Sequence, residues 1–371
     1  MSKLKVCHLT SAHKCYDTRI FFKECISIAA SGIDTFLVVT GTHDQQKHGV
    51  NIVNAGVYHE SRLKRMLISA WRVYRSGYKL DANIYHFHDP ELLPYGFLLK
   101  LRGKKVVYDV HEDVAADILD KDWITGWLRK SIAALFDFFE KLIALRLDGV
   151  AAVTVDIANK FKPRKRTKVV LVRNFPVISL IDAVVNQPEI KDGKFILIYS
   201  GMLTKNRGLI PLIQAMHFVA HDIELWLLGE WENEALQNEC CLLSGYSKVK
   251  YMGRVSQEMS IAKIKEADVG MINFLPIPNH VTALPNKPFE YMACGLPMIM
   301  SNFDSWKEMF DGCALFVNPN DSKDIAEKIT VLYQNRQMAN EFGLKGFKLV
   351  REKYSWESES KTLVSLYNEL Q

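Results

Sequence analysis

Three polar side chains in one short segment could act on a single ligand. Residues 285–297 read PNKPFEYMACGLP and run into an apolar strand. Asn286, Lys287 and Glu290 are three and four residues apart, so they share one face of a helix that Gly295 would end. An amide, an ammonium group and a carboxylate at a helix–strand junction suit the hydroxyl groups of a sugar. The plainer alternative is a surface helix with a Lys287–Glu290 ion pair, worth roughly a few tenths of a kcal/mol.

Further candidates follow the strand-like runs of the same half of the chain. Residues 200–208 read SGMLTKNRG, where Gly201 allows a tight turn into a helix whose free N–H groups suit an anion. Arg207 could add a bidentate, charge-assisted bond to a phosphate. Gly229 and Arg254 end the next two runs, so we expect them at the same edge of a sheet. A purely structural turn and a solvated Arg254 are the alternatives.

In the first half, ionisable side chains follow the first strand-like run. His13, Asp17 and Arg19 lie between this run and the next helix. Asp17 or Thr18 could cap that helix, because a side-chain oxygen accepts from its first free N–H groups. His13 and Arg19 would then lie near the ligand-binding edge of the sheet.

Histidines and carboxylates also end the next two strands. His86 and His88 alternate onto one face, Asp89 follows them, and His111 and Glu112 end the following strand. Imidazole and carboxylate suit zinc or manganese, so a metal centre is one interpretation. Histidines at strand ends more often orient a substrate, donate to a hydroxyl or move a proton. We predict this second role and no metal site.

Apolar runs alternate with amphipathic segments along the whole chain. The strand candidates are residues 4–10, 35–40, 83–88, 105–110, 150–155, 168–172, 195–200, 224–228, 248–252, 269–272, 297–301 and 314–317. This alternation predicts an α/β protein with two doubly wound parallel sheets, each covered on both faces. The alternation breaks in a Pro- and Gly-containing stretch, which predicts domains at 1–175 and 195–354 joined by a linker at 176–194. Ligands bind beyond the carboxyl ends of such strands, so we expect a site in a cleft between the domains.

The bulk composition excludes several classes of protein. The chain has 371 residues, 48% of them hydrophobic, which suits two domains. A net charge of +5 is too small for a general polyanion binder, so we predict no nucleic-acid partner. The seven cysteines are scattered without a CxxC pair, which is typical of reduced thiols in the cytoplasm. The first residues lack the apolar core of a signal peptide, and charged residues interrupt the longest apolar segment.

Four motifs together resemble the retaining, nucleotide-sugar-dependent glycosyltransferases of GT-B architecture, family 4. They are PNKPFEYMACGLP, DTRIFFKE, HDPELL and YDVHED, and the last three are similar to a branch found in bacterial surface-polysaccharide synthesis. The resemblance covers essentially the whole chain. It implies two Rossmann-like domains, with the acceptor on the first, the donor on the second, and the final helix, residues 355–371, packed back on the first.

The resemblance also implies a reaction. A sugar moves with retained configuration from a nucleotide diphosphate-sugar, expected to be uridine-linked, to a saccharide or polyprenyl-linked acceptor, and no metal or other cofactor is needed. Basic side chains stabilise the departing diphosphate.

Individual residues carry these implied roles. The catalytic candidates are His111, which matches the histidine near the transferred sugar, with Arg207 and Lys287. The nucleotide-binding candidates are Gly201, Arg207, Gly229, Arg254 and Glu290, of which Glu290 matches the ribose-binding glutamate. The candidates for the donor sugar are Asn286, Lys287 and Thr282. The acceptor-side candidates are His13, Asp17, Arg19, His88 and Glu112.

Two positions depart from the family pattern. A second glutamate usually stands eight residues before Glu290, where this chain has Thr282, and an arginine often stands where this chain has Met202. Losing one charge-assisted bond costs about 1.5–3 kcal/mol, or roughly 10- to 100-fold in affinity. Lys205, Lys287 or Arg254 would have to compensate.

Two basic amphipathic segments are candidates for a membrane surface. Residues 62–78 read RLKRMLISAWRVYRSGY, and residues 123–130 hold two tryptophans next to Arg129 and Lys130. Such segments suit anionic membranes, at about 1 kcal/mol per well-placed cation. The alternative is a core-packed helix with a solvated basic face. A lipid-linked acceptor would explain both, so we expect a cytoplasmic protein that is peripheral on the inner face of the cell membrane.

Two other functions stay open on the sequence. The histidines could serve a nucleotide-sugar epimerase or hydrolase on the same scaffold. The departures at Thr282 and Met202 would suit a non-catalytic partner protein that kept the GT-B fold.

Overall fold

The computed structural model describes residues 3–119, 125–161, 167–185, 193–281 and 284–371. Contacts divide the chain into two compact units. The first comprises Met1–Asn174 and Trp356–Gln371, and the second comprises Phe175–Ser355. The final helix, α17 (Trp356–Leu370), is therefore part of the first unit. The stretch expected as a linker contains a helix, α8 (Ile178–Ala183), which belongs to the second unit.

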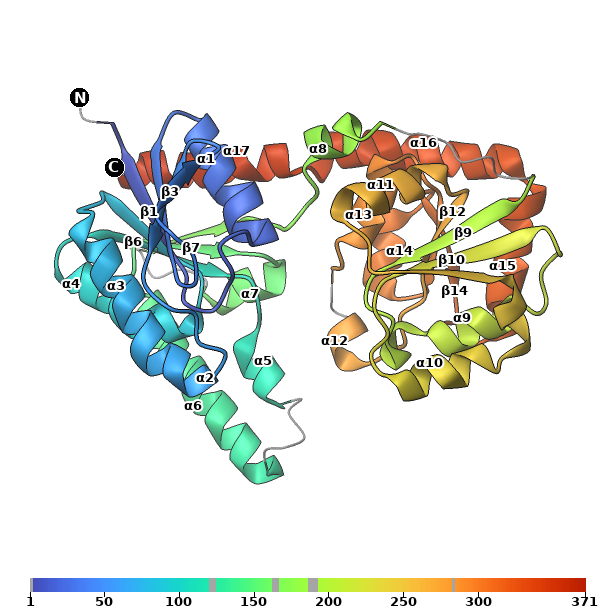
Figure 1. Ribbon diagram of the computed structural model, residues 1–371, viewed down its shortest axis with the longest axis horizontal. Helices are drawn as coiled ribbons and strands as arrows, with labels where there is room; N and C mark the ends of the chain where they lie inside the picture. The colour runs from blue at the N-terminus through green and yellow to red at the C-terminus, as the bar shows by residue number, and fades with distance from the viewer. Residues whose placement is uncertain (1–2, 120–124, 162–166, 186–192, 282–283) are drawn as a thin grey trace. The chain divides into compact units, whose positions relative to one another are not determined.

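The first unit is built on an eight-stranded sheet (Figure 1). Its strand order is β3-β4-β2-β1-β5-β6-β7-β8, and only the edge pair β3 and β4 is antiparallel. The strands are β1 (Lys5–Leu9), β2 (Asp34–Val39), β3 (Gln45–Lys47), β4 (Val50–Asn54), β5 (Ile84–Phe87), β6 (Lys105–Val110), β7 (Gly149–Ala152) and β8 (Lys168–Leu171). The sequence pattern does not predict β3 and β4, because QQK has no apolar residue and the apolar residues of β4 alternate with two asparagines.

Helices cover both faces of this sheet. They are η1 (Thr18–Cys25), α1 (Ile26–Ala30), α2 (Arg62–Lys64), η2 (Arg65–Ser69), α3 (Ala70–Lys79), η3 (Pro90–Leu92), α4 (Leu93–Leu101), α5 (Val114–Leu119), α6 (Gly126–Ala144), α7 (Val155–Lys160) and α17. Leu9 packs on Gly77 of α3, and Phe87 packs on Gly96 of α4. Because side chains alternate along a strand, His8 and His86 point to the opposite face, toward η1 and α17. Both η1 and η2 are π-helical.

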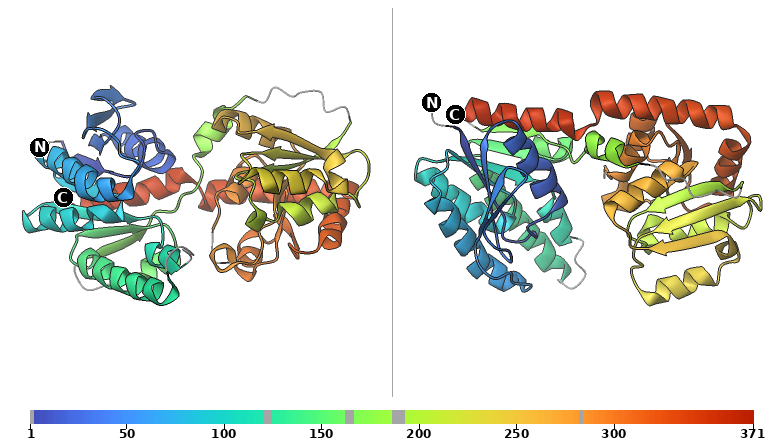
Figure 2. Two further views of the ribbon diagram at one scale, coloured as in Figure 1. Left: turned by 60° about the horizontal axis from the view of Figure 1, so that its bottom comes forward. Right: turned by 45° about the horizontal axis from the view of Figure 1, so that its top comes forward.

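The second unit is built on a six-stranded, all-parallel sheet of order β11-β10-β9-β12-β13-β14. The strands are β9 (Phe195–Ser200), β10 (Ile223–Leu228), β11 (Val249–Gly253), β12 (Val269–Ile272), β13 (Met298–Ser301) and β14 (Ala314–Val317). The helices are α8, η4 (Lys205–Arg207), α9 (Leu209–Ala215), α10 (Glu234–Cys241), η5 (Ser244–Lys248), α11 (Gln257–Glu266), α12 (Pro278–Val281), α13 (Lys287–Ala293), α14 (Asp304–Phe310), α15 (Ser322–Gln334) and α16 (Arg336–Lys353). Every residue of β9, β12 and β13 is buried, as expected for strands with helices on both faces (Figure 2).

The described residues include no helix that is long and apolar enough to cross a membrane.

Candidate functional site

Two glycine turns meet at the carboxyl ends of β9 and β10. The Gly201 N–H donates to Leu228 O at 2.9 Å, and the Gly229 N–H donates to Gly253 O at 2.8 Å. Gly229 has φ of 144°, and a Cβ there would lie only 1.8 Å from the carbonyl oxygen of Gly201. Glycine is therefore required for the turns to approach each other, and the candidates Gly201 and Gly229 lie side by side.

Arg207 lies close to the Gly201 turn. A Cβ built on Gly201 would be 2.8 Å from its guanidinium. The guanidinium donates to the Tyr199 hydroxyl at 3.4 Å and lies 5.3 Å from the centre of the Phe274 ring. Within the described parts of the chain, no carboxylate forms an ion pair with it. A half-buried cation held by two aromatic side chains is thus available to an anion beside the glycine turns.

Tyr291 fixes α13 to the same edge of the sheet. Its buried hydroxyl accepts a hydrogen bond from the Ser200 N–H at 3.1 Å. The next residue back, Glu290, pairs with Lys287, whose Nζ lies 2.6 Å from Oε2. Asn286 is at the N-cap without a capping bond from its side chain. The ion pair shows that Lys287 and Glu290 share a face as predicted, and a sugar or ribose hydroxyl would have to join or replace this pair.

Arg254 and Thr282 are the remaining donor-side candidates. Arg254 pairs with Glu230 at 3.4 Å, but its side chain is 78% exposed. Exposed pairs of this kind contribute about 0–1 kcal/mol, so the geometry favours the solvated alternative. Thr282 lies outside the described residues.

Asp89 organises the loop after β1 in the first unit. Its carboxylate accepts from the backbone N–H groups of Ser11 and Ala12 and from the Thr10 hydroxyl, and it lies 2.8 Å from His13 Nδ1. Burial alone would raise the pKa of Asp89, but the His13 hydrogen bond and charge, with the two N–H groups, lower the pKa to about 2. Burial alone would lower the pKa of His13, but Asp89 outweighs it and raises the pKa to about 9. The pair is therefore ionised at neutral pH.

His111 lies beside this ion pair. Its ring is 5.2 Å from the His13 ring, edge to face, and its Nδ1 is 3.4 Å from Asp109 Oδ2. The two histidine side chains are 30% and 17% exposed, and Glu112 is exposed. The accessible part of the predicted set in this unit is therefore His13, His111 and Glu112, together with the half-buried Asp17.

The structure corrects the expectation for Arg19 and His88, which lie in the core and not at the surface. The Arg19 guanidinium donates two hydrogen bonds to Asp109, at 2.7 and 2.9 Å, and His88 Nδ1 lies 3.0 Å from the same carboxylate. Both side chains are buried because Asp109, within the apolar strand β6, attracts them inward. Asp17 is the cap of η1 and accepts from the N–H groups of Arg19 and Ile20.

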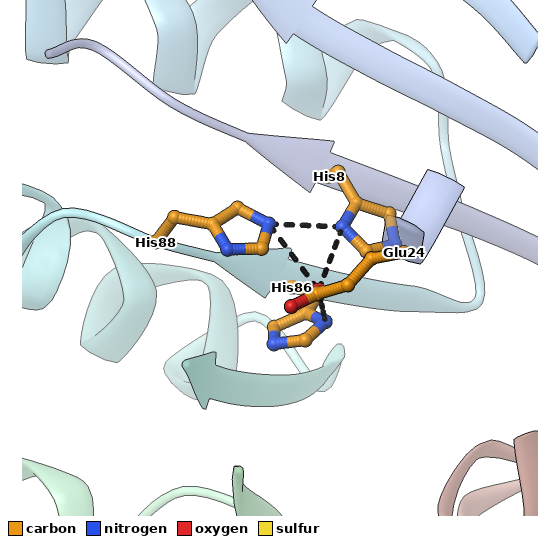
Figure 3. Close-up of side chains that lie close together, drawn as sticks. All are labelled: His8, Glu24, His86 and His88. Atoms are coloured by element: carbon orange, nitrogen blue, oxygen red, sulfur yellow. Dashed lines mark hydrogen bonds and ion pairs between the residues drawn. The ribbon is translucent and has the colours of Figure 1, made fainter. Parts of the chain in front are cut away.

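His8 and Glu24, which were not among the predicted site residues, complete a buried cluster with His86 and His88 (Figure 3). His8 on β1 is in register with His86 on β5, and Glu24 of η1 lies over both. Burial lowers the pKa of all three histidines, so they are neutral, and burial raises the pKa of Glu24. A histidine inside the apolar run KVCHL was the available signal.

The cluster differs from the metal-binding group considered on the sequence. Asp89, His111 and Glu112 lie outside it. His86 and His88 are fully buried and cannot touch a substrate. An epimerase or hydrolase that uses these histidines for acid–base chemistry therefore has no support in the structure.

An apolar pocket of about 500 Å³ lies in the first unit between η2, η3, α5 and α6. It is lined by Arg62, Met66, Pro90, Glu91, Val114, Ile118, Thr125, Leu128, Ile132 and Phe136. Met66 belongs to the basic segment 62–78 and Leu128 to the basic segment 123–130, so the two segments meet at this pocket. Core packing explains only part of residues 62–78, because Leu63 and Leu67 are each 67% exposed.

Comparisons with solved structures identify the architecture. A glycosyltransferase from Rickettsia africae superposes with a TM-score of 0.76 at 14% identity, over 100% of this chain and 99% of that chain. Sucrose-phosphate synthase from Thermosynechococcus elongatus gives 0.74 at 17% identity, over 99% of both chains. The chain has the GT-B fold. Anabaena HepE, solved in complex with UDP-glucose, is a further GT-B structure of this kind, with a TM-score of 0.71 at 15% identity over 99% of this chain and 100% of that chain.

Sequence comparisons find similarity to known proteins over part of this GT-B chain. Residues 194–335, within the second unit, match the family Glycosyl transferases group 1. An uncharacterised glycosyltransferase of Methanocaldococcus jannaschii is 26% identical over 183 residues, 48% of this chain and 46% of that protein. The capsular polysaccharide biosynthesis glycosyltransferase CapM of Staphylococcus aureus is 26% identical over 181 residues, 47% of this chain and 46% of that protein. The matched stretch thus spans about half the length of these relatives.

The stability of the first unit is expected to depend on pH through His13 and Asp89. The pKa of Asp89 falls from 3.8 to about 2 on folding, so its contribution is full above about pH 4 and is lost as the pH falls toward 2. The pKa of His13 rises from 6.5 to about 9, so its contribution is full below about pH 6 and is lost as the pH rises toward 9. Thermal denaturation of the wild type and of His13→Gln should differ most between about pH 4 and 6, by about 2 kcal/mol. A difference that stays constant from pH 3 to 10 would contradict this assignment.

Proposed function

We propose that this chain is a family 4 glycosyltransferase. It transfers a sugar from a UDP-sugar, with retention of configuration, to a lipid-linked saccharide acceptor in surface-polysaccharide synthesis. The observation that carries the proposal is the Arg207 guanidinium, a cation without an ion-pair partner among the described residues, held beside the Gly201 and Gly229 turns. Its place within the group 1 match, and the UDP-glucose bound by the HepE neighbour, support a nucleotide-sugar donor.

The donor-side residues have distinct roles in this proposal. The glycine turns allow a diphosphate to approach the backbone, and Arg207 balances the negative charge that develops as the diphosphate leaves. Because this cation belongs to the protein, the transfer step needs no metal. Glu290 binds the ribose, and Lys287 and Asn286 face the transferred sugar. His111, beside the ionised His13–Asp89 pair, is the group of the first unit that contacts the sugar or the acceptor.

The test of this proposal is a thermal-shift screen with a panel of nucleoside diphosphates and nucleotide sugars, without added metal. UDP is expected to raise the melting temperature of the wild type, and Glu290→Ala is expected to abolish that shift because the ribose contact is lost. Glu308→Ala, which removes an exposed carboxylate of α14, is the matched control and should behave as the wild type. The proposal fails if no nucleotide stabilises the protein. The role of Glu290 fails if its variant binds UDP normally.

The acceptor is identified by a transfer assay with the donor that stabilises the protein best. Mass spectrometry of lipid-linked saccharides should show one added sugar, and NMR coupling constants of the product should show the anomeric configuration of the donor. Release of free sugar without an acceptor would instead indicate a hydrolase.

The exposed apolar side chains around the pocket support a peripheral membrane location. On α6, Trp127 is 72% exposed, Phe138 59% and Phe139 49%, and the exposed Leu63 and Leu67 belong to α2 and η2, whose Arg62 and Met66 line the pocket. Arg62, Lys64 and Lys130 flank them. Apolar side chains bordered by cations suit the surface of an anionic bilayer, and the pocket suits the hydrocarbon of a polyprenyl acceptor.

Membrane binding is expected to depend on these side chains. Leu63→Ser combined with Leu67→Ser, and separately Phe138→Ser combined with Phe139→Ser, should each lower binding to anionic phospholipid vesicles by about tenfold or more, because each pair buries apolar area in the interface. Co-sedimentation with vesicles measures this. Leu242→Ser, which changes a leucine that is 88% exposed in the second unit, is the control and should bind as the wild type. Equal binding by all these proteins would exclude this surface.

A further inference from the structure

The buried cluster of the first unit has the spacing of a metal-binding site (Figure 3). His8 Nδ1 and His88 Nε2 are hydrogen-bonded at 2.9 Å, a contact that an ion would replace, and Glu24 Oε2 lies 3.8 Å from the first and 4.0 Å from the second. The two longer distances exceed any hydrogen bond. The point equidistant from the three atoms is about 2.1 Å from each, which is the length of a zinc–nitrogen or zinc–oxygen bond.

The Glu24 carboxylate is unsatisfied in this environment. It is fully buried, and neither oxygen accepts a hydrogen bond from the described residues. Arg19 Nε lies 3.1 Å from Oε1 and balances that side of the group. Oε2 is left facing three imidazoles, with His86 Nδ1 also at 3.8 Å. Buried polar atoms normally have a partner, and a cation at the common centre would supply one.

His8 and His88 also have the outer contacts that metal ligands require. A ligating histidine usually donates its second ring N–H to a carboxylate or another acceptor, which fixes the ring and its tautomer. His88 Nδ1 lies 3.0 Å from Asp109 Oδ2, so its Nε2 is directed into the cluster. His8 Nε2 lies 3.4 Å from the Tyr367 hydroxyl, so its Nδ1 is directed the same way. In His86, Nδ1 is the nitrogen nearest Glu24 and lies 2.5 Å from the same hydroxyl, so the ion would replace this contact.

We propose that His8, Glu24, His86 and His88 bind one structural zinc ion in the first unit. Three imidazoles and one carboxylate are a donor set that suits zinc, with four protein ligands and no open position. The ion would join β1, the end of β5 and η1. Because the site is fully buried, it takes no part in sugar transfer, and the proposal is independent of the proposed function.

Metal analysis of the purified protein tests this proposal. Protein produced in zinc-supplemented medium and then passed through a chelating resin is expected to retain about one zinc ion per chain. Glu24→Gln and His88→Gln keep similar side-chain volumes and should each lower the retained zinc by about tenfold or more. His13→Gln, a change to a histidine of the same unit outside the cluster, is the matched control and should retain the metal.

If the cluster variants do not fold, refolding of the wild type tests whether the first unit needs the metal. Protein unfolded in denaturant with a chelator should regain the full melting temperature only when zinc is returned. Refolding with cobalt(II) should give the visible absorption of a four-coordinate nitrogen–oxygen site. Complete refolding without metal, together with no cobalt spectrum, would overturn the proposal. One zinc ion per chain in both cluster variants would overturn the assignment of its ligands.

Discussion

Replacing Arg19 with methionine is expected to destabilise the first unit by about 3–5 kcal/mol, because it breaks a buried ion pair from one side. The guanidinium makes two hydrogen bonds to Asp109, and its Nε is 3.1 Å from Glu24. Methionine fills a similar volume but removes the charge. The Asp109 carboxylate would then lose its cation, and water cannot reach it because its side chain has no exposed surface.

Hydrogen exchange measures this loss within the first unit. Amides of β1, β5 and β6 are expected to exchange roughly 100- to 4000-fold faster in Arg19→Met than in the wild type, since each 1.4 kcal/mol is about tenfold. The amides of β9 and β12 in the second unit serve as an internal reference and should not change. Lys307→Met, which removes an exposed pair with Asp304 at 3.3 Å, is the control and should cost less than about 0.5 kcal/mol. Unchanged protection of β1 and β5 in Arg19→Met would show that the pair does not stabilise the core.

Replacing Arg207 with methionine is expected to weaken the binding of UDP by roughly 10- to 100-fold, as one charge-assisted bond contributes about 1.5–3 kcal/mol. Tyr199 and Phe274 hold the guanidinium in place before a ligand arrives. Little conformational entropy is then lost on binding. Arg207→Lys keeps the charge but loses the planar fork, so an intermediate affinity is expected.

Isothermal titration with UDP measures these affinities. Arg254→Met is the matched control, because Arg254 is 78% exposed and should change the dissociation constant by no more than about twofold. The melting temperature without nucleotide should be the same in all three variants, since Arg207 forms no ion pair within the described residues. An unchanged affinity for UDP in Arg207→Met would remove the observation on which the proposed function rests. If Arg254→Met weakened UDP binding as much as Arg207→Met does, the phosphates would not bind specifically at Arg207.

Local sequence patterns predicted most of the regular structure. All twelve proposed strands are present, because continuous apolar runs between helices are required where a parallel sheet is covered on both faces. The glycine turn at 200–208 and the helix with Glu290 were predicted for a similar reason. The turn depends on a glycine with positive φ, and the shared face of the helix depends on polar residues spaced three and four apart. Both features involve only neighbours in the chain. The weakest signals were β3 and β4, which carry few apolar side chains and form the edge of the sheet.

The sequence could not reveal where the ionisable residues of the first unit would point. Arg19 and His88 were expected near a ligand, but both are buried against Asp109. Whether a charge faces water or the core depends on a partner far away in the chain, because a buried charge is tolerated only when it is paired. No local pattern contains that partner.

The sequence by itself determined two parallel α/β sheets and, through the spacing of its glycines and polar residues, the turns and the helix at one sheet edge of the second unit. Only the tertiary structure decided which distant residues meet. The parallel register of β1 and β5 puts His8 beside His86, the turn of η1 brings Glu24 over them, and the packing of α6 near η2 joins Met66 and Leu128 in one pocket. The physical reason is that the period of a strand or helix fixes the face on which a side chain lies, whereas pairing register and packing fix what that face meets.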